Sequence, residues 1–235
     1  MIIPTRRVVL RGGLGVAAAL VAGCAGTPPP ALTPPSPSPS PSPSPSPAPD
    51  PGAALAELER RQGRRIALVA LDTGSGRAVR HRADERVLMC STAKVLIVAA
   101  VLRRRLAEPA LLERTIRYSR ADLLEYTSTA AAMSADLQGL VLGAALDPAG
   151  RDLLTGWMLG ATTGAQQIRA GLPAGWRVGD KTGSGAQGED HDVAVAWPPG
   201  RAPVVLAVYT TPSDPESTNG RATVAEATRI AVGAL

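Results

Sequence analysis

The sequence predicts a mixed α/β (α+β) fold, in which an antiparallel sheet of about five strands is flanked by helices. Two segments rich in β-formers lie early in the folded part of the chain, and three lie late. Helical segments stand at both ends and between these two groups. The strand candidates are short, apolar and separated by Gly or Pro turns. This grouping indicates one antiparallel sheet covered by helices.

The first half of the folded part contains a helix, a hairpin and a second helix. Residues 53–62 are rich in Ala, Leu and Glu and predict a helix. Residues 65–71 are β-formers that end in the turn signal at 72–76, and 77–82 can return as the hairpin partner. Residues 91–106 contain no helix breaker and are apolar on most sides, which predicts a buried helix.

The second half begins with helices and returns to strands. Two helices are expected between residues 130 and 159, and Asp147-Pro148 opens the second of them. The remaining elements are strands at 176–181, 192–197 and 204–211, followed by a last helix at 220–234.

Composition and charge exclude several classes of function. The chain of 235 residues has a formal net charge of +5, but three of its arginines lie in an N-terminal segment that we expect to be removed. The others are scattered or lie on helix faces, and no aromatic residues interleave with them, so we expect no nucleic-acid partner. The two cysteines, Cys24 and Cys90, form neither a disulfide framework nor a zinc-site spacing. No metal or cofactor is expected, and the protein is expected to be a monomer.

Residues 1–23 predict an export signal. Arg6-Arg7 precedes an apolar run at 12–23, which resembles a twin-arginine signal; an ordinary secretory signal with two adjacent arginines is the alternative. Twelve apolar residues span about 18 Å as a helix, too short for a bilayer core of about 30 Å. The run ends at Val21-Ala22-Gly23-Cys24, which resembles a lipoprotein processing site with lipid on Cys24. Cleavage without lipidation is the alternative.

Residues 24–51 predict a tether. The stretch 27–50 is Pro-rich and includes a Ser-Pro alternation at 36–47, which favours an extended polyproline II form and cannot form a packed core. Its 24 residues would reach about 75 Å. The folded domain is therefore expected at 52–235, outside the cell, held at the outer face of the membrane by a lipid anchor or secreted.

Only two of the 25 cationic side chains are lysines, Lys94 and Lys181. Arginine keeps its proton in a protein, whereas a partly desolvated lysine can become neutral and act as a base. Lys94 follows Ser91 by three residues near a helix start, which places hydroxyl and amine on one face. A neutral Lys94 amine would activate the Ser91 hydroxyl as a nucleophile. The helix N-terminus would favour a developing oxyanion.

The second lysine lies in Lys181-Thr182-Gly183-Ser184, at the end of an apolar strand. A cation and a hydroxyl in this position suit a substrate carboxylate, and the small glycine lets a ligand lie against the backbone. Either motif alone is weak evidence for a catalytic site, because a surface lysine beside a turn has the same local sequence. Both motifs in this order are the signature of penicillin-recognising serine enzymes.

The surrounding sequence resembles class A serine β-lactamases of actinobacterial type. The resemblance covers almost all of 52–235 and rests on the segments 82–92, 118–119, 122–126, 162–164 and 175–181. It implies a β-lactamase/transpeptidase-like fold and a β-lactam substrate. By this resemblance Ser91 attacks the lactam carbonyl and Lys94 accepts its proton. The resemblance further implies an oxyanion hole made by the N–H groups of Ser91 and Ser184, a carboxylate site at Lys181, Thr182, Gly183 and Ser184, and Tyr126 at the rim.

The sequence departs from this family in the middle. The family's Ser-Asp-Asn motif and its catalytic Glu loop are not evident, and only 90 positions separate Ser91 from Lys181. We place an internal deletion near Tyr126-Thr127, which leaves the helical subdomain incomplete and uncovers apolar surface on the Ser91 helix. Ser128 is a poor candidate for the missing hydroxyl, since the residues after it fit a later helix better.

The residues expected to assist the carboxylate site are also changed. Gln167 stands where the family usually has an arginine. Arg169 could compensate for that arginine, but we expect it to make an ordinary surface contact instead. The cluster Asp190-His191-Asp192 is interpreted as a solvated turn rather than part of a Ser-His-Asp site, because no nucleophile elbow exists. His81 fits a strand surface, and metal binding by the two histidines is not expected.

Three functions follow as hypotheses. The first is a β-lactam-hydrolysing enzyme impaired by the missing segment. The second is a penicillin-binding acyl trap that does not hydrolyse its adduct. The third is an inactive cell-envelope lipoprotein that keeps the fold.

Overall fold

The computed structural model describes residues 50–115, 117, 119 and 126–235. The predicted signal peptide, Cys24 and nearly all of the predicted tether lie outside the described residues, so their roles stay predictions. Among the helices of the described part, none is both long enough and apolar enough to cross a membrane.

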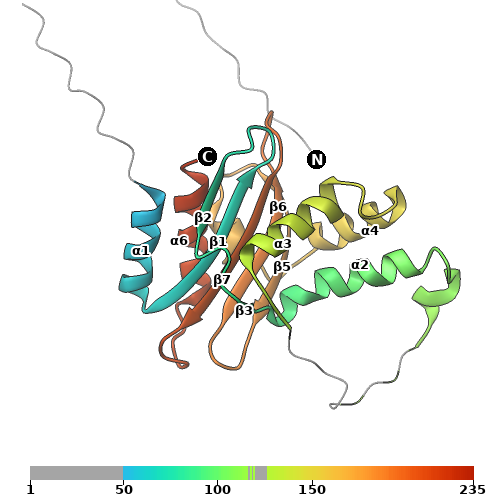
Figure 1. The fold of residues 1–235 in the computed structure, drawn as a ribbon, viewed down its shortest axis with the longest axis horizontal. Coiled ribbons are helices and arrows are strands. Elements are labelled where there is room, and N and C mark those ends of the chain that lie inside the picture. Colours follow the sequence, from blue (N-terminus) through green and yellow to red (C-terminus); the bar gives the residue numbers. More distant parts are fainter. Residues whose placement is uncertain (1–49, 116, 118, 120–125) are drawn as a thin grey trace, which may run out of the picture. The chain divides into compact units, whose positions relative to one another are not determined.

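A five-stranded antiparallel sheet forms the centre of the domain, in the order β2-β1-β7-β6-β5 (Figure 1). The predicted fold class is therefore confirmed. The strands are β1 (Arg64–Asp72), β2 (Ala78–His81), β5 (Arg177–Ser184), β6 (Asp190–Trp197) and β7 (Val204–Pro212). The first strand pairs with the last one along its whole length, from Arg64 opposite Pro212 to Asp72 opposite Val204.

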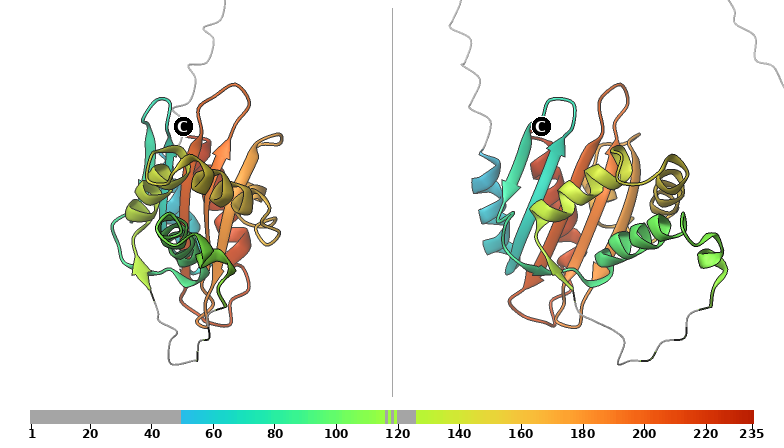
Figure 2. Two further views of the ribbon diagram at one scale, coloured as in Figure 1. Left: turned by 90° about the vertical axis from the view of Figure 1, so that its right-hand side faces the viewer. Right: turned by 45° about the vertical axis from the view of Figure 1, so that its right-hand side comes forward.

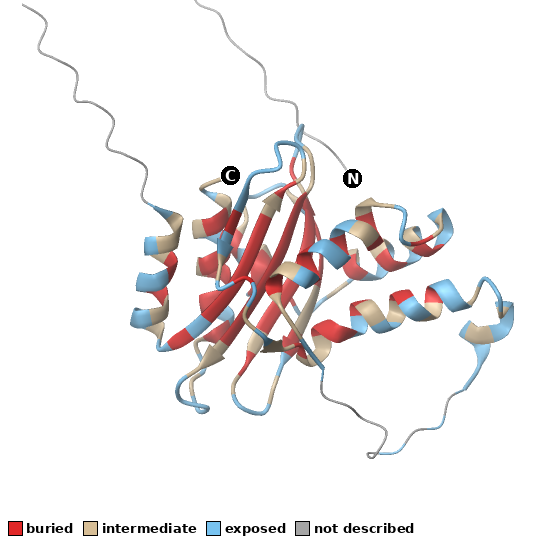
Figure 3. Cartoon of the chain, viewed as in Figure 1, coloured by how far each residue is buried: buried red, intermediate tan, exposed pale blue. Residues whose placement is uncertain are grey.

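Helices cover both faces of this sheet (Figures 1 and 2). On one face lie α1 (Pro51–Gln62), α5 (Ile168–Gly171) and α6 (Gly220–Val232), and on the other lie α2 (Lys94–Arg104), α3 (Ala130–Leu137) and α4 (Pro148–Leu159). Side chains alternate between the faces, so that Ile66 and Leu68 join the first core while Ala67 and Val69 join the second. Strands buried on both sides explain the continuous apolar runs (Figure 3).

The smaller elements lie before and after α2 in the chain. The strand β3 (Val87–Leu88) leads into the 3₁₀ turn η1 (Cys90–Ala93), which opens the helix, and a second 3₁₀ turn, η2 (Pro109–Glu113), follows the helix. The strand β4 (Thr127–Ser128) comes later in the chain and pairs with β3 in a two-stranded ladder. The helix α3 continues into a π-helical turn, η4 (Gln138–Leu142).

The predicted start of α4 is present in detail. Asp147 is the N-cap, and its side chain accepts a hydrogen bond from the backbone N–H of Gly150. Pro148 occupies the first helical position, where its missing N–H costs nothing. Asp147 also forms an ion pair with Arg105 at 3.0 Å, which ties α4 to the end of α2.

The prediction that residues 91–106 form a buried helix was only partly right. The segment begins as the η1 turn, the α-helix ends at Arg104, and Ile97 on α2 is 45% exposed. Two apolar side chains of α4, Leu153 and Trp157, are also exposed. Apolar side chains of α2 and α4 are therefore exposed in the described part of the chain.

The interpretation of Asp190-His191-Asp192 as a solvated turn was wrong. The three residues begin β6, which lies between β5 and β7, and both His191 and Asp192 are fully buried. The polar residues did not indicate a buried strand, because the strands that pair with it, β5 and β7, are not recognisable from these residues alone. The ring Nδ1 of His191 accepts a hydrogen bond from the Thr210 N–H, and Asp192 accepts one from the Ile168 N–H.

Burial makes His191 a source of pH-dependent stability. It lowers the pKa of the His191 imidazole from 6.5 to about 4. Between these values the unfolded chain binds a proton that the folded chain does not, so the free energy of unfolding falls as the pH falls from 6.5 towards 4. The loss is on the order of 3 kcal/mol.

Urea unfolding of the native chain and of His191→Asn between pH 7 and 4 tests this prediction. The asparagine oxygen can accept the Thr210 N–H, so the variant keeps that contact but does not titrate. We expect the variant to show the shallower pH dependence. Parallel curves for the two proteins would show that His191 is not the group responsible.

Candidate active site

Ser91 and Lys94 lie in direct contact. Ser91 belongs to η1, Lys94 is the first residue of α2, and the Lys94 Nζ donates a hydrogen bond to the Ser91 Oγ at 3.1 Å. The backbone N–H of Lys94 also bonds to the Ser91 carbonyl, which fixes the turn between them. A neutral amine at this distance can take the hydroxyl proton without rearrangement.

The residue before Ser91 has an uncommon backbone conformation. Cys90 has φ +48°, in the left-handed region that side chains other than glycine rarely adopt. On its other side, the Met89 N–H donates to the Tyr126 carbonyl at 2.8 Å. Sparsely populated conformations of this kind persist where surrounding contacts hold them, and they cluster at functional sites.

Strand β5 packs closely against this turn. A Cβ atom at Gly183 would lie 3.2 Å from the Ser91 nitrogen and 3.2 Å from the Met89 carbonyl oxygen. Only glycine fits here without displacing backbone, so the Gly of Lys-Thr-Gly is a packing requirement. β5 is also the outer strand of the sheet, so alternate N–H groups along it point away from β6.

Side chains of β5 divide between its two faces. Lys181 and Gly183 lie on the face that carries Lys94, while Thr182 and Ser184 lie on the other. The hydroxyls of Thr182 and Thr163 share a hydrogen bond at 2.8 Å, and the Ser184 Oγ donates to the Asp190 carboxylate at 3.3 Å. The predicted carboxylate-binding set is therefore split across the edge of the strand.

The two lysines of the chain lie beside each other. Lys94 and Lys181 line one cavity of about 480 Å³, and the Lys181 Nζ donates to the Thr182 carbonyl at 2.7 Å. Burial lowers the pKa of the Lys181 ammonium, and the charge of Lys94 lowers it further. The structure thus brings together the two motifs that lie far apart in the sequence.

A second cavity includes Ser91 in its lining. Its volume is about 290 Å³, and Ser91, Tyr126 and Ser184 all line it. Tyr126 is 44% exposed. Ser128 lies in β4 opposite Val87 and lines neither cavity in the described part of the chain.

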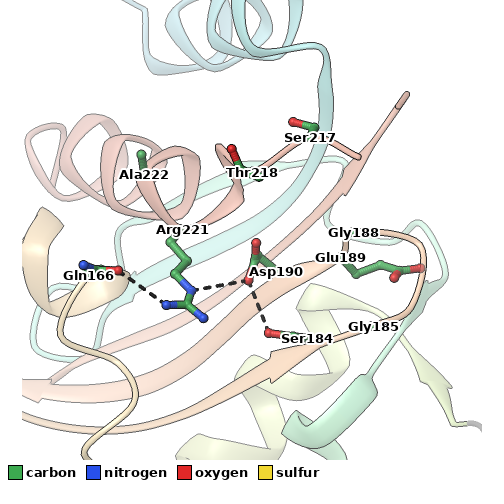
Figure 4. Close-up of a pocket in the computed structure, with 10 residues that line it drawn as sticks. All are labelled: Gln166, Ser184, Gly185, Gly188, Glu189, Asp190, Ser217, Thr218, Arg221 and Ala222. Carbon is green, nitrogen blue, oxygen red and sulfur yellow. Dashed lines mark hydrogen bonds and ion pairs between the residues drawn. The ribbon is translucent and has the colours of Figure 1, made fainter. Parts of the chain in front are cut away.

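Sequence reasoning missed Arg221, which lies in a third cavity of about 630 Å³ beside Ser184 (Figure 4). Its Nη1 is 3.5 Å from the Gln166 Oε1, and its Nε is 4.0 Å from the Asp190 carboxylate that accepts from Ser184. Arg221 is in the first turn of α6 and belongs to no motif. Only the packing of α6 against the sheet brings it to the end of β5.

The prediction that Arg169 makes an ordinary surface contact was also wrong. Its guanidinium pairs with Asp180, which is fully buried directly before Lys181. Burial raises the pKa of the Asp180 carboxyl, and Arg169 opposes that rise. Gly164 packs so closely on Asp180 that an added Cβ would lie 2.0 Å from a carboxylate oxygen.

Gln167 is buried as well, and its side-chain amide donates to the His191 carbonyl at 3.2 Å. It supports β6 and supplies no charge to the site. No group of three or more His, Cys, Asp or Glu side chains suited to a metal occurs among the described residues.

Comparison with known proteins gives consistent matches. The model of the β-lactamase enzyme family matches residues 51–128 and again 123–235. The chain is 38% identical to β-lactamase AST-1 of Nocardia asteroides over 254 aligned positions, which cover 77% of this chain and 82% of that protein. A β-lactamase of Amycolatopsis lactamdurans is 36% identical, with 73% and 80% covered.

Solved structures agree with the sequence matches. A class A β-lactamase from Mycobacterium abscessus superimposes with a TM-score of 0.73 at 41% identity, covering 79% of this chain and 99% of that one. An ancestral class A β-lactamase gives a TM-score of 0.68 at 35% identity, with 79% and 100% covered. The motifs around Ser91 and Lys181, the sheet order and these matches all lead to one assignment: the chain belongs to the class A β-lactamase family.

Proposed function

We propose that this protein opens β-lactam rings through an acyl-serine intermediate on Ser91. The observation that supports this most directly is the 3.1 Å contact between the Lys94 Nζ and the Ser91 Oγ. Lys94 takes the hydroxyl proton while the Ser91 oxygen bonds to the lactam carbonyl carbon. The ring C–N bond then breaks, and the proton passes to the leaving nitrogen.

The backbone N–H groups of Ser91 and Ser184 are proposed as the oxyanion hole. Two features support this: both residues line the cavity beside Tyr126, and β5 is an outer strand that lies against the Ser91 turn. Preorganised donors at a developing oxyanion stabilise the transition state more than the ground state. The close approach at Gly183 holds the two donors in one place.

The substrate carboxylate is proposed to bind at the end of β5. Lys181 supplies a cation from one face of the strand, and Thr182 and Ser184 supply hydroxyls from the other face. Arg221 supplies a second cation beside Ser184. Arginine offers a planar fork of donors that matches a carboxylate. In this role Arg221 would replace the arginine that the family usually has at the position of Gln167.

Deacylation is proposed to be slow. It needs a carboxylate that activates water, and the acids that line the two cavities beside Ser91 and Lys94 are otherwise engaged. Asp180 is paired with Arg169, and a carboxylate oxygen of Glu189 accepts the backbone N–H of Gln187 at 2.9 Å. The acylating groups are assembled, whereas a positioned base for water is not among the described residues.

We attribute this imbalance to an internal deletion. The alignment with the Nocardia enzyme runs over 254 positions, although this chain has only 235 residues in all. Some aligned positions of that relative therefore face a gap. The two segments matched by the family model meet at residues 123–128, near the predicted break. The Ser-Asp-Asn motif and the Glu loop would lie in the missing part.

A penicillin-binding acyl trap is accordingly the second candidate function. It shares the acylation step with the first and differs only in the fate of the adduct. Export, lipidation of Cys24, a Pro-rich tether at 24–51, a folded domain at 52–235 and a monomeric state complete the proposal. Mass spectrometry of the membrane fraction tests the lipid directly.

The central prediction is a lasting adduct on Ser91. After incubation with a chromogenic cephalosporin, intact-mass spectrometry should show one added acyl group, and product should form slowly. Ser91→Ala should show no adduct. Lys94→Arg should lose it as well, because arginine cannot take the hydroxyl proton. Ser128→Ala is the matched control, since it removes a nearby serine that lines neither cavity, and it should acylate normally.

The outcomes separate the three hypotheses. Rapid turnover without a stable adduct would keep the serine chemistry and refute slow deacylation. A stable adduct without product identifies the trap. Neither turnover nor adduct in a protein that melts cooperatively would refute both enzymatic proposals and leave the lipoprotein.

The prediction for Arg221 concerns the carboxylate. Arg221→Ala should lower the second-order rate of acylation by about tenfold for a cephalosporin that has a free carboxylate, which corresponds to about 1.4 kcal/mol. The methyl ester of the same cephalosporin should react equally with both proteins. Arg229→Ala, on the same helix but bonded to the Ala170 carbonyl, is the control. Equal losses for acid and ester would assign Arg221 a merely structural role.

A further inference from the structure

A groove between α2 and α4 opens at the two lysines and does not include Ser91. Its volume is about 480 Å³. The residues that line it come from α2, α4, the segment after α4 and β5: Lys94, Val95, Val98, Leu154, Trp157, Met158, Gly160, Ala161, Thr162, Thr163, Asp180 and Lys181. This is larger than the cavity of about 290 Å³ that holds Ser91 and lies within the usual range of small-molecule sites.

The walls of the groove are apolar along most of its length. Leu154 and Met158 are buried and form the base, and Val98 lies across from them on α2. Trp157 borders the groove with 52% of its surface exposed. A large exposed aromatic side chain beside buried apolar ones forms a patch of the kind that marks a binding site. The indole supplies a flat, rigid surface at low entropic cost.

The end of the groove is cationic. Lys94 and Lys181 both border it, and no ion pair with a carboxylate is formed by either lysine within the described ranges. The one acid of the lining, Asp180, is paired with Arg169. Burial lowers the pKa of Lys181, and repulsion from Lys94 lowers it further, while Asp192 and Asp180 oppose the shift. A bound anion would relieve that repulsion.

We propose that this groove binds an amphipathic organic anion without covalent chemistry. The carboxylate lies between Lys94 and Lys181, and an aromatic body lies along Val98, Leu154 and Trp157. The charge at one end and the apolar walls together define this ligand class; a neutral apolar molecule leaves the lysines unpaired, and a small inorganic anion leaves the walls open. The proposal does not depend on acylation of Ser91.

Binding is measured in the Ser91→Ala background, where no adduct can form. The probe is 4-phenylbutyrate, and 4-phenylbutan-1-ol is its neutral match with the same apolar body. Isothermal titration calorimetry should show the acid binding at least about tenfold more tightly than the alcohol, because its hydrogen bonds to the lysines are charge-assisted. The preference should shrink at high salt.

Two substitutions locate the site. Trp157→Ala should weaken binding of the acid and of the alcohol alike, by about tenfold. Lys181→Gln should weaken the acid only, which removes the preference for charge. Leu112→Ala is the matched control, because this leucine is 49% exposed in η2 and lies outside the groove. A thermal melt of each variant shows whether it is folded.

The results are decisive in both directions. The groove is supported as the site if Trp157→Ala weakens binding of both ligands, Lys181→Gln weakens binding of the acid only, and Leu112→Ala weakens neither. Equal affinity for acid and alcohol would overturn the role of the lysines. Unchanged binding in Trp157→Ala, or no binding at millimolar acid, would overturn the site itself. Since no lactam is present, none of these outcomes depends on the proposed acylation.

Discussion

The approach of β5 to the turn that carries Ser91 is the contact on which the rest of the site depends. At Gly183 the strand comes so close that an added Cβ would lie 3.2 Å from the Ser91 nitrogen. That distance sets where Lys181 and Ser184 lie relative to the nucleophile. Cys90, which has a left-handed backbone conformation, lies in the same contact, because its Cβ would also be 3.2 Å from a Cβ at position 183. A side chain at position 183 would separate two motifs that are useful only when they are adjacent.

Two buried carboxyls support β5. Asp180 of β5 and Asp192 of β6 lie on the same face of the sheet, and burial raises the pKa of both carboxyls, with Asp180 adding to the rise at Asp192. Arg169 pairs with the first, and the Ile168 N–H bonds to the second. Breaking such a pair by removing one partner is costly, because it leaves an uncompensated charge in the interior. The arrangement of the candidate site therefore also depends on buried polar groups next to it.

How far the sequence could predict the structure depended on whether the signal was local. Asp147-Pro148 marked the start of α4 because capping uses residues a few positions apart. Ser91 and Lys94 were found for the same reason. The burial of His191 and Asp192 was missed because a run of polar letters gives no sign of partners in β7 and α5. Arg221 was missed because only the packing of α6 brings a motif-free arginine to the end of β5.

The pairing of β1 with β7 has a consequence for how the domain is made. The strand at the beginning of the fold bonds along its full length to the last strand, from Arg64 opposite Pro212 onward. Pairing between strands so far apart in sequence has a large entropic cost of loop closure, which must be met before the contacts between the strands form. This slows folding. During synthesis β1 can pair at first only with the short strand β2. Its other edge stays unpaired until β7, near the end of the chain, has been synthesised. Until β7 is made, the nascent chain therefore exposes an unpaired strand edge, which is the kind of surface that favours aggregation.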